Sequence, residues 1–329
     1  MPPGSKPKQR AQFFRELAQL TAAGISVTQA AKVLGQDWRD ATVRGAVAQM
    51  ERGLAEGGTI AGALSPSLSA MEHSVIGSAE RGGKLSQGFR HLEDYYHLLD
   101  QTIDRVRGAL LYPLFMLHAA VLLPALVNAV TSKTGIVEAL LTRLLWMWAA
   151  LVLLWYGGKW LGRLARTHSV VDRLLHALPY VGNTRQGLAM ARWHAVMHFN
   201  ITSGQRIADG LREAGAATSS ARLETASRRA ARAVDDGSEL GAALIGQAAF
   251  PREMAGALAA AEFTGTLDTE TQRWSRQSMT EAALLMETSS KRLCAVFYGV
   301  VVLFTAWQIL QMAGNYVGMY QKAFKDLGI

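Results

Sequence analysis

One stretch of the sequence carries no charge over 25 residues, and it limits the possible folds more than any other feature. Residues 108–132, between Arg107 and Lys133, read GALLYPLFMLHAAVLLPALVNAVTS and contain no Asp, Glu, Lys or Arg. A helix of this length reaches about 37 Å, whereas the hydrocarbon core of a bilayer is about 30 Å thick. A buried helix of a soluble protein rarely lacks a charged face over such a length. We therefore expect a transmembrane helix here.

Two more apolar stretches follow. Residues 144–161 are strictly uncharged only over 144–158, which is short for a span, so a buried or re-entrant helix is the alternative. Five Trp and Tyr side chains in this stretch can act as interfacial aromatic residues. Between Arg292 and Lys322, 29 residues carry no charge. The pattern predicts three transmembrane helices.

The remaining segments have the polar, periodic pattern of helices and show no convincing alternation typical of a strand. The only cysteine is Cys294, which excludes an intrachain disulfide and is best interpreted as a structural thiol. The expected fold class is all-α: an integral membrane protein with three transmembrane helices and two repeated cytoplasmic helical-bundle domains.

The distribution of charge predicts the orientation in the membrane. Residues 1–107 carry 13 Lys or Arg and residues 159–292 carry 17, whereas the linker 131–142 carries one. Basic segments stay on the cytoplasmic side. We expect the N-terminus and both large polar segments in the cytoplasm and the C-terminus in the periplasm. The net charge of +8 then reflects orientation and contact with membrane lipid, and nucleic-acid binding is not expected because no recognised motif accompanies it.

The two polar segments are copies of one another. With an offset of 180 residues, Gly24 aligns with Gly204 and Gly57 with Gly237; after a two-residue insertion, the segment from Glu80 to Leu85 aligns with the segment from Glu262 to Leu267. The glycines stand where one helix ends and another starts, and such corners often need a positive φ. Each glutamate is either a helix-terminal carboxylate that satisfies a turn, or a contact for a partner or a weak cation ligand.

These patterns give a division of the chain. The expected segments are a disordered N-terminus at 1–9, a cytoplasmic helical domain at 10–107, a span at 108–130, a periplasmic loop at 131–143, a span at 144–161, a second cytoplasmic domain at 162–292, a span at 293–313 and a periplasmic tail at 314–329.

Two segments are similar to known catalytic or metal-binding motifs, but each lacks residues that the motif needs. No catalytic residue, cofactor or metal site is therefore expected. The stretch from Ser78 to Leu85 is like a phosphate loop but lacks its first glycine and its Ser or Thr after Lys84. His194 and His198 share a helix face, yet a zinc site needs further ligands and a metalloprotease needs Glu after the first His.

The order of segments and the repeated motifs resemble the F-protein family of type II secretion, which includes the inner-membrane platform proteins of type IV pili. The repeated domain of that family has an aromatic-led helix ending at a glycine corner, then Gly-x-x-Leu-x-x-Ala-Leu, then Gly-Glu-x-Ser-Gly-x-Leu. The similar segments here are Phe13–Gly24, Gly57–Leu64 and Glu80–Leu85, then Trp193–Gly204, Gly237–Leu244, Phe250-Pro251 and Glu262–Leu267, with Tyr112-Pro113 at the start of the first span.

The sequence departs from the family pattern at several positions. Ala79 and Ala261 replace the glycine before the glutamate, and Leu68-Ser69 stands in the first copy where the second has Phe-Pro. The short N-terminus is similar to that of compact members in type IVb-like systems. The residues that the resemblance marks as structural or partner-contact candidates are Gly24, Gly57, Glu80, Gly83, Leu85, Tyr112, Pro113, Gly204, Gly237, Phe250, Pro251, Glu262, Gly265 and Leu267.

The resemblance implies a function without catalysis. The cytoplasmic bundles would couple an assembly ATPase to the extraction of pilins or pseudopilins from the inner membrane, with other inner-membrane assembly proteins as partners and a homo-oligomer as the working form. A small transporter or channel subunit is the alternative, and His118, Asn128 and Gln308 are the polar groups that it would use. A membrane-bound enzyme or sensor would need a catalytic cluster, which the sequence does not offer.

Overall fold

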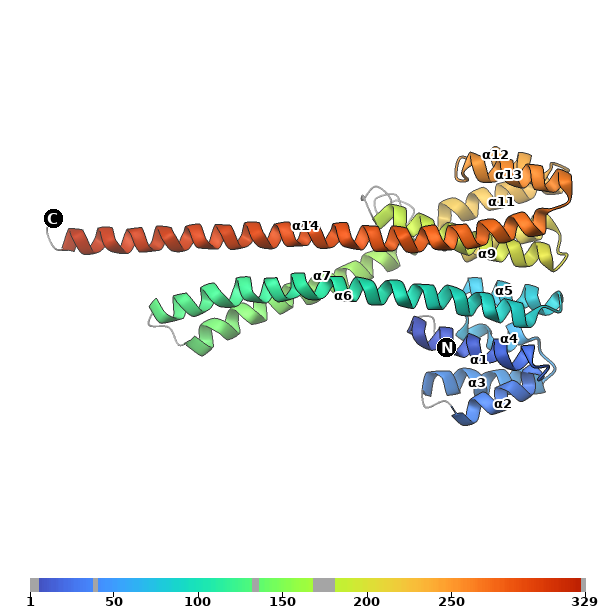
Figure 1. Ribbon diagram of the computed structural model, residues 1–329, viewed down its shortest axis with the longest axis horizontal. Coiled ribbons are helices and arrows are strands. Elements are labelled where there is room, and N and C mark those ends of the chain that lie inside the picture. The colour runs from blue at the N-terminus through green and yellow to red at the C-terminus, as the bar shows by residue number, and fades with distance from the viewer. Residues whose placement is uncertain (1–5, 38–40, 132–135, 168–180, 327–329) are drawn as a thin grey trace. The chain divides into compact units, whose positions relative to one another are not determined.

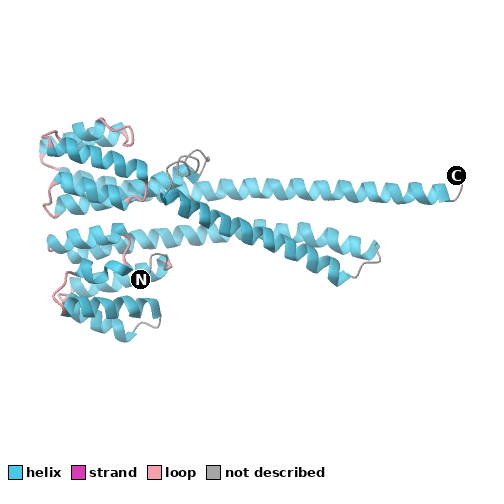
Figure 2. Cartoon of the chain, turned by 180° about the vertical axis from the view of Figure 1, so that it is seen from behind, coloured by secondary structure: helices cyan, strands magenta, loops and turns pink. Residues whose placement is uncertain are grey.

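The computed structural model describes residues 6–37, 41–131, 136–167 and 181–326, and most of these residues lie in helices. These residues contain no strand (Figure 2). The expected all-α fold is therefore confirmed. The helices run in the order α1 (Pro7–Ala22), α2 (Val27–Asp37), α3 (Ala41–Ala55), α4 (Ile60–Leu64), the 3₁₀ turn η1 (Ser65–Ser67), α5 (Ala70–Arg81), α6 (Leu85–Thr131), α7 (Ile136–Thr167), α9 (Val181–Thr202), α10 (Ile207–Ala217), α11 (Ala221–Asp235), α12 (Leu240–Ile245), α13 (Arg252–Thr264) and α14 (Leu267–Asp326) (Figure 1).

The order of helices repeats. Helices α1 to α5 and the start of α6 correspond one by one to α9 to α13 and the start of α14. The chain forms two compact units, whose described residues fall within 1–103 with 173–286, and within 104–172 with 287–329. We call the first the repeat unit, because it holds both copies, and the second the three-helix unit. Helices α6 and α14 each contribute residues to both units.

A continuous apolar core stabilises the repeat unit and draws side chains from both copies. Its largest fully buried members include Phe13, Phe14 and Phe89 from the first copy and Trp193 from the second. Burial of aromatic side chains of this size contributes a large share of the hydrophobic stabilisation of a core. The aromatic residues that lead the first helix of each copy are therefore packing residues.

The surface of the three-helix unit is apolar, unlike that of the repeat unit. Its helices expose large apolar side chains, among them Leu145 at 69%, Trp146 at 75% and Leu303 at 72%. Three helices are long and apolar enough to cross a membrane, and their apolar segments lie within Leu85–Leu122, Leu140–Gly158 and Leu267–Gln311. Exposed apolar side chains of this size suit a hydrocarbon environment.

Several helix boundaries differ from the expected segments. Pro7–Gln9, expected to be disordered, form the first turn of α1, because proline is favourable at the start of a helix. Helix α7 begins at Ile136, inside the expected loop, and α14 continues to Asp326 through most of the expected C-terminal tail. Residues 1–5, 132–135, 168–180 and 327–329, which belong to the expected N-terminus, loop, second domain and tail, lie outside the described residues.

Candidate functional site

The glutamate of each copy caps a short helix. In the first copy, Oε1 of Glu80 accepts a hydrogen bond from the backbone N–H of Ile60 at 2.8 Å, and Oε2 accepts one from Ala61 at 3.3 Å. In the second copy, Glu262 accepts from the first two N–H groups of α12, at 2.9 and 3.1 Å. A helix leaves its first N–H groups without intrahelical partners, and a carboxylate there is stabilised by charge-assisted bonds and by the helix dipole. The glutamate and the short helix that follows the second glycine thus form one linked motif.

Six glycines of the motifs adopt a left-handed backbone, and each stands at a corner between two helices. A residue with a Cβ is strained there, whereas glycine is not. The φ angles are +79° at Gly24, +78° at Gly57, +66° at Gly83, +72° at Gly204, +94° at Gly237 and +71° at Gly265. The expectation of positive φ at the helix corners is therefore confirmed.

Phe250 of the second copy belongs to the core, and Pro251 starts a helix. The ring centroid of Phe250 lies 5.0 Å from that of Trp193, which donates a hydrogen bond from Nε1 to Oγ of Ser227 at 2.9 Å. Pro251 is exposed and holds the N-cap position of α13.

The first copy starts the corresponding helix, α5, by different chemistry. Ser69 and Glu72 form a reciprocal capping box, in which the Glu72 carboxylate accepts from the Ser69 N–H at 2.6 Å. The absence of Phe-Pro from the first copy therefore has a local compensation.

The remaining motif residues divide between the two units. Leu85 and Leu267 open helices α6 and α14 and pack, partly buried, against the core of the repeat unit. In the three-helix unit, the ring of Tyr112 is exposed and lies 6.1 Å from the ring of Tyr298, and Pro113 is buried inside α6. Pro113 removes one backbone donor from α6.

Sequence analysis missed the contact between the two copies. Helix α5 of the first copy packs against α9 and α10 of the second. The buried hydroxyl of Ser78 donates to the side-chain oxygen of Asn200, and Nζ of Lys84 donates to the Thr202 carbonyl at 3.2 Å. The lack of a side chain at Gly82 permits this approach, because a Cβ there would lie 2.8 Å from the Cβ of Ser203.

An ion pair flanks this contact at its edge. A guanidinium nitrogen of Arg81 lies 3.6 Å from a carboxylate oxygen of Glu213, and both side chains are partly exposed. A comparison of residue types between the two copies could have marked this position, since the residue that matches Arg81 is apolar.

The two histidines of the expected helix face have different surroundings. His194 is buried, its ring stacks on Trp274, and its Nδ1 lies 2.9 Å from the Met190 carbonyl oxygen. Burial lowers the pKa of His194 to about 4. His198 instead lines a polar cavity of about 460 Å³ together with His91. No group of three His, Cys, Asp or Glu side chains placed to hold a metal ion occurs in the described parts of the chain.

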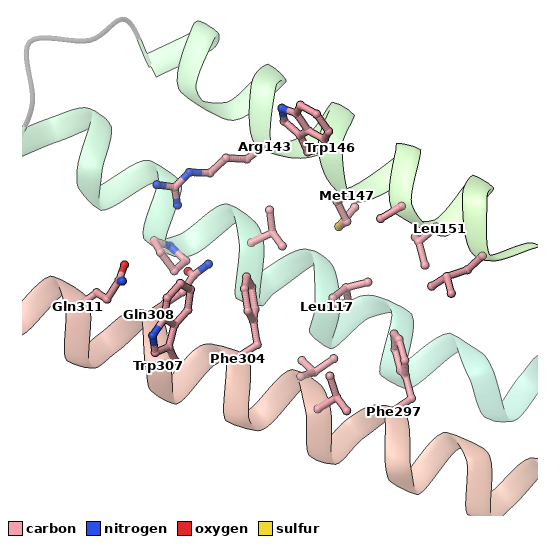
Figure 3. Close-up of a pocket in the computed structure, with 16 residues that line it drawn as sticks. Leu117, Arg143, Trp146, Met147, Leu151, Phe297, Phe304, Trp307, Gln308 and Gln311 are labelled. Carbon is pink, nitrogen blue, oxygen red and sulfur yellow. The ribbon is translucent and has the colours of Figure 1, made fainter.

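A larger cavity of about 610 Å³ lies among α6, α7 and α14 of the three-helix unit (Figure 3). Its walls are mainly apolar and aromatic, with Leu117, Leu151 and Phe297 toward one end. Arg143 and Gln308 lie at the other end (Figure 3). Oε1 of Gln308 is buried and makes no hydrogen bond within the described residues.

Of the polar groups that a transport path would use, only Gln308 lines this cavity. The Nδ1 atom of His118 lies 2.7 Å from the Leu114 carbonyl oxygen of its own helix, and its ring meets Trp148 edge to face. His118 therefore has the role of a packing residue between helices. The side chain of Asn128 lies outside the described part of the structure.

Helix α11 presents a row of exposed arginines. Arg228 pairs with Glu224 at 2.5 Å, and Arg222 donates to the Ala248 carbonyl at 3.1 Å. Arg229 and Arg232 make no ion pair or hydrogen bond with other described side chains. Two unpaired guanidinium groups on one exposed face can receive acidic groups of a partner, although a solvated face would have the same composition.

Comparisons with known proteins agree with this architecture. The profile of the family described as "Type II secretion system (T2SS), protein F" matches the chain twice, over residues 13–132 and 196–313. The chain is 26% identical to type II secretion system protein F of Aeromonas hydrophila over 94% of its own length and 86% of that protein. It is 24% identical to type IV pilus assembly protein PilC of Thermus thermophilus, over 90% of the chain and 79% of the relative. With PilC of Pseudomonas aeruginosa the identity is 20%, over 80% and 77%.

Proposed function

The chain belongs to the type II secretion system protein F family, and from this membership we propose that it is an inner-membrane platform protein of a type IV pilus or a type II secretion machine. In this role it couples a cytoplasmic assembly ATPase to the extraction of pilins or pseudopilins from the membrane. The chain itself carries out no chemical step. Both copies of the helical bundle face the cytoplasm, and the C-terminus faces the periplasm.

The observation that carries this proposal is the combination of two units in one chain. A repeat unit with a polar surface and a common core is joined through α6 and α14 to a three-helix unit that exposes apolar side chains. A coupling protein needs one part that binds the soluble ATPase and one part that contacts the pilin or pseudopilin in the membrane. The names of the relatives, secretion protein F and pilus assembly protein PilC, fit the same role.

The cavity of the three-helix unit is the proposed contact for the cargo. Its apolar walls can receive side chains from the transmembrane helix of a pilin, while Arg143 and Gln308 at one end can bind a polar group on that helix. An unpaired amide oxygen in an apolar environment is unfavourable, so a partner that donates a hydrogen bond to Gln308 is stabilised there.

The exposed arginines of α11 are the proposed contact for the ATPase. Arg229 and Arg232 would bind acidic side chains of the motor. The first copy offers a matched control, because Arg52 on α3 holds the position that corresponds to Arg232 and is also exposed.

Co-purification from the native host tests the proposal. The full chain, extracted in mild detergent, is expected to retain the assembly ATPase of its machine. The Arg229→Glu/Arg232→Glu variant is expected to lose most of the bound ATPase, and Arg52→Glu to keep it. A loss with Arg52→Glu alone would move the contact to the first copy. Failure of the unaltered chain to bind any ATPase would refute the coupling role.

A further inference from the structure

The contact between the two copies uses one surface from each. The first copy contributes the corner between α5 and α6, at Ser78–Lys84, and the second contributes the corner between α9 and α10, at Asn200–Gln205 with Glu213. We call these the donor corner and the acceptor corner. Because the copies are related by a repeat, the chain contains each corner a second time. The second donor corner is Ala260–Thr266, between α13 and α14, and the second acceptor corner is Leu20–Ile25 with Val33, on α1 and α2.

The second pair of corners is exposed in the single chain. Among the described residues of the repeat unit, large apolar side chains are exposed at four positions, which are Val33, Ile245, Phe263 and Leu284. Phe263, on the second donor corner, is 92% exposed, and Val33, on the second acceptor corner, is 45% exposed. A phenylalanine side chain exposed to this degree on the soluble part of a protein commonly marks a contact with another protein.

The repeat offset connects these two residues. Phe263 corresponds to Arg81, and Val33 corresponds to Glu213, so the exposed apolar pair matches the ion pair that flanks the contact inside the chain. One other pair changes in the same direction. The hydrogen-bonded pair of Ser78 and Asn200 becomes Ala260 and Leu20.

Two polar pairs of the internal contact are thus replaced by apolar pairs at the open one, whereas Lys84 corresponds to the polar Thr266. Gly82 and Ser203, whose close approach leaves no room for a Cβ at position 82, become Thr264 and Ala23, so the two open corners must lie farther apart at this position than the internal ones do. At these two pairs the residues on both surfaces change together from polar to apolar, so they remain complementary to each other.

We propose that the second donor corner of one copy of the chain docks on the second acceptor corner of another copy, in the arrangement of the internal contact but with a wider separation at Thr264 and Ala23. Phe263 then packs against Val33 and Ile25 of the neighbouring copy, and Ala260 packs against its Leu20. The contact is heterologous, since it joins two different surfaces, and it therefore builds a ring or an open array of copies. The occupant is a second copy because no other partner is expected to carry the surface that matches the donor corner in residue type and spacing.

A charge exchange at this pair tests the proposal. Phe263→Arg and Val33→Glu, each alone, are expected to weaken self-association of the full chain in nanodiscs about tenfold or more, as loss of a central aromatic contact does. An equimolar mixture of the two single variants is expected to recover dimers, because Phe263 of the Val33→Glu chain still meets the unaltered Val33 of the Phe263→Arg chain. In the double variant Phe263→Arg/Val33→Glu, every contact joins an introduced arginine to an introduced glutamate, as Arg81 pairs with Glu213, and association is expected to recover in part. Ile245→Arg, also at an exposed apolar residue, is the matched control and is expected to change nothing.

The copy number is measured by mass photometry over a range of protein concentrations. Single variants that associate as well as the unaltered chain would overturn the proposal. Loss of association in both single variants without recovery in the mixture would also overturn it, because the two residues would then not be partners.

Disulfide cross-linking gives an independent test that does not depend on disruption. In a Cys294→Ser background, a chain with Ala260→Cys is mixed with a differently tagged chain with Leu20→Cys. The proposal predicts cross-links between the two tags, since the matching pair of Ser78 and Asn200 is in hydrogen-bond contact. Cross-links only between two Ala260→Cys chains would show an isologous contact and contradict the head-to-tail arrangement.

Discussion

Arg10 and Glu72 form a buried ion pair in the first copy, at the two positions where the second copy has Met190 and Met254. Arg10 is 3% exposed and Glu72 is fully buried. Arg10 also donates to the Ser67 carbonyl at 3.3 Å, and Glu72 belongs to the capping box of α5. The matching positions are thus occupied once by a buried ion pair and once by two buried thioether side chains.

The difference between the copies predicts the outcome of a double-mutant cycle. Arg10→Met leaves the Glu72 carboxylate buried without its partner, and we expect a loss of about 3–5 kcal/mol of stability. Arg10→Met/Glu72→Met recreates the apolar pair of the second copy and is expected to recover most of that loss, apart from about 1 kcal/mol for the capping bond. The measurement is thermal unfolding of the full chain in detergent. A double variant no more stable than Arg10→Met would contradict the equivalence of the two pairs.

Neutralising a motif glutamate is expected to destabilise its short helix. In Glu262→Gln, the amide nitrogen faces a backbone N–H of α12 in place of a carboxylate oxygen, so one charge-assisted bond is lost. The expected cost is about 1–2 kcal/mol, with the same sign for Glu80→Gln. Glu239, the N-cap residue of α12, makes no side-chain capping bond, so Glu239→Gln is the control. Equal melting temperatures for Glu262→Gln and the control would refute the capping role.

A glycine with a left-handed backbone and a glycine inside a helix give a matched comparison. Gly265 has φ +71°, so Gly265→Ala is expected to lower the stability by about 1–2 kcal/mol. Gly256 lies in the middle of α13 with open space around an added Cβ, so Gly256→Ala is expected to raise the stability by up to about 1 kcal/mol. Hydrogen exchange at α13 would report both changes, and a stabilising Gly265→Ala would show that the left-handed corner is absent.

Much of this architecture could be predicted from sequence because it depends on local signals. The corner glycines mark helix ends, and the uncharged stretches mark membrane-spanning helices, without knowledge of any distant contact. The contact between the copies could not be predicted, because the bond of Ser78 to Asn200 joins residues 122 positions apart. The start of α1 at Pro7 was not predicted, because the polar composition of residues 1–9 indicated disorder. The preference of proline for the first turn of a helix was given less weight.

Acid is expected to destabilise the repeat unit between about pH 6.5 and 4. Burial lowers the pKa of His194 to about 4 in the folded chain, whereas an exposed histidine has a pKa near 6.5. In that window the unfolded chain binds a proton that the folded chain does not, so stability is fully present above about pH 6.5 and falls with decreasing pH. Melting temperatures of the full chain from pH 7.5 to 4.5 measure this slope. His194→Gln is expected to reduce the slope, and the exposed His73→Gln is expected to leave it unchanged.

The central claim is that both copies of the helical bundle face a cytoplasmic motor, and the membrane topology tests it most directly. Reporter fusions after Ser132, near Ser219 and after Ile329 give the side of the membrane at three points. The account predicts a periplasmic signal at Ser132, a cytoplasmic signal at Ser219 and a periplasmic signal at Ile329. A periplasmic signal at Ser219 would place the second copy out of reach of the ATPase and contradict the platform function.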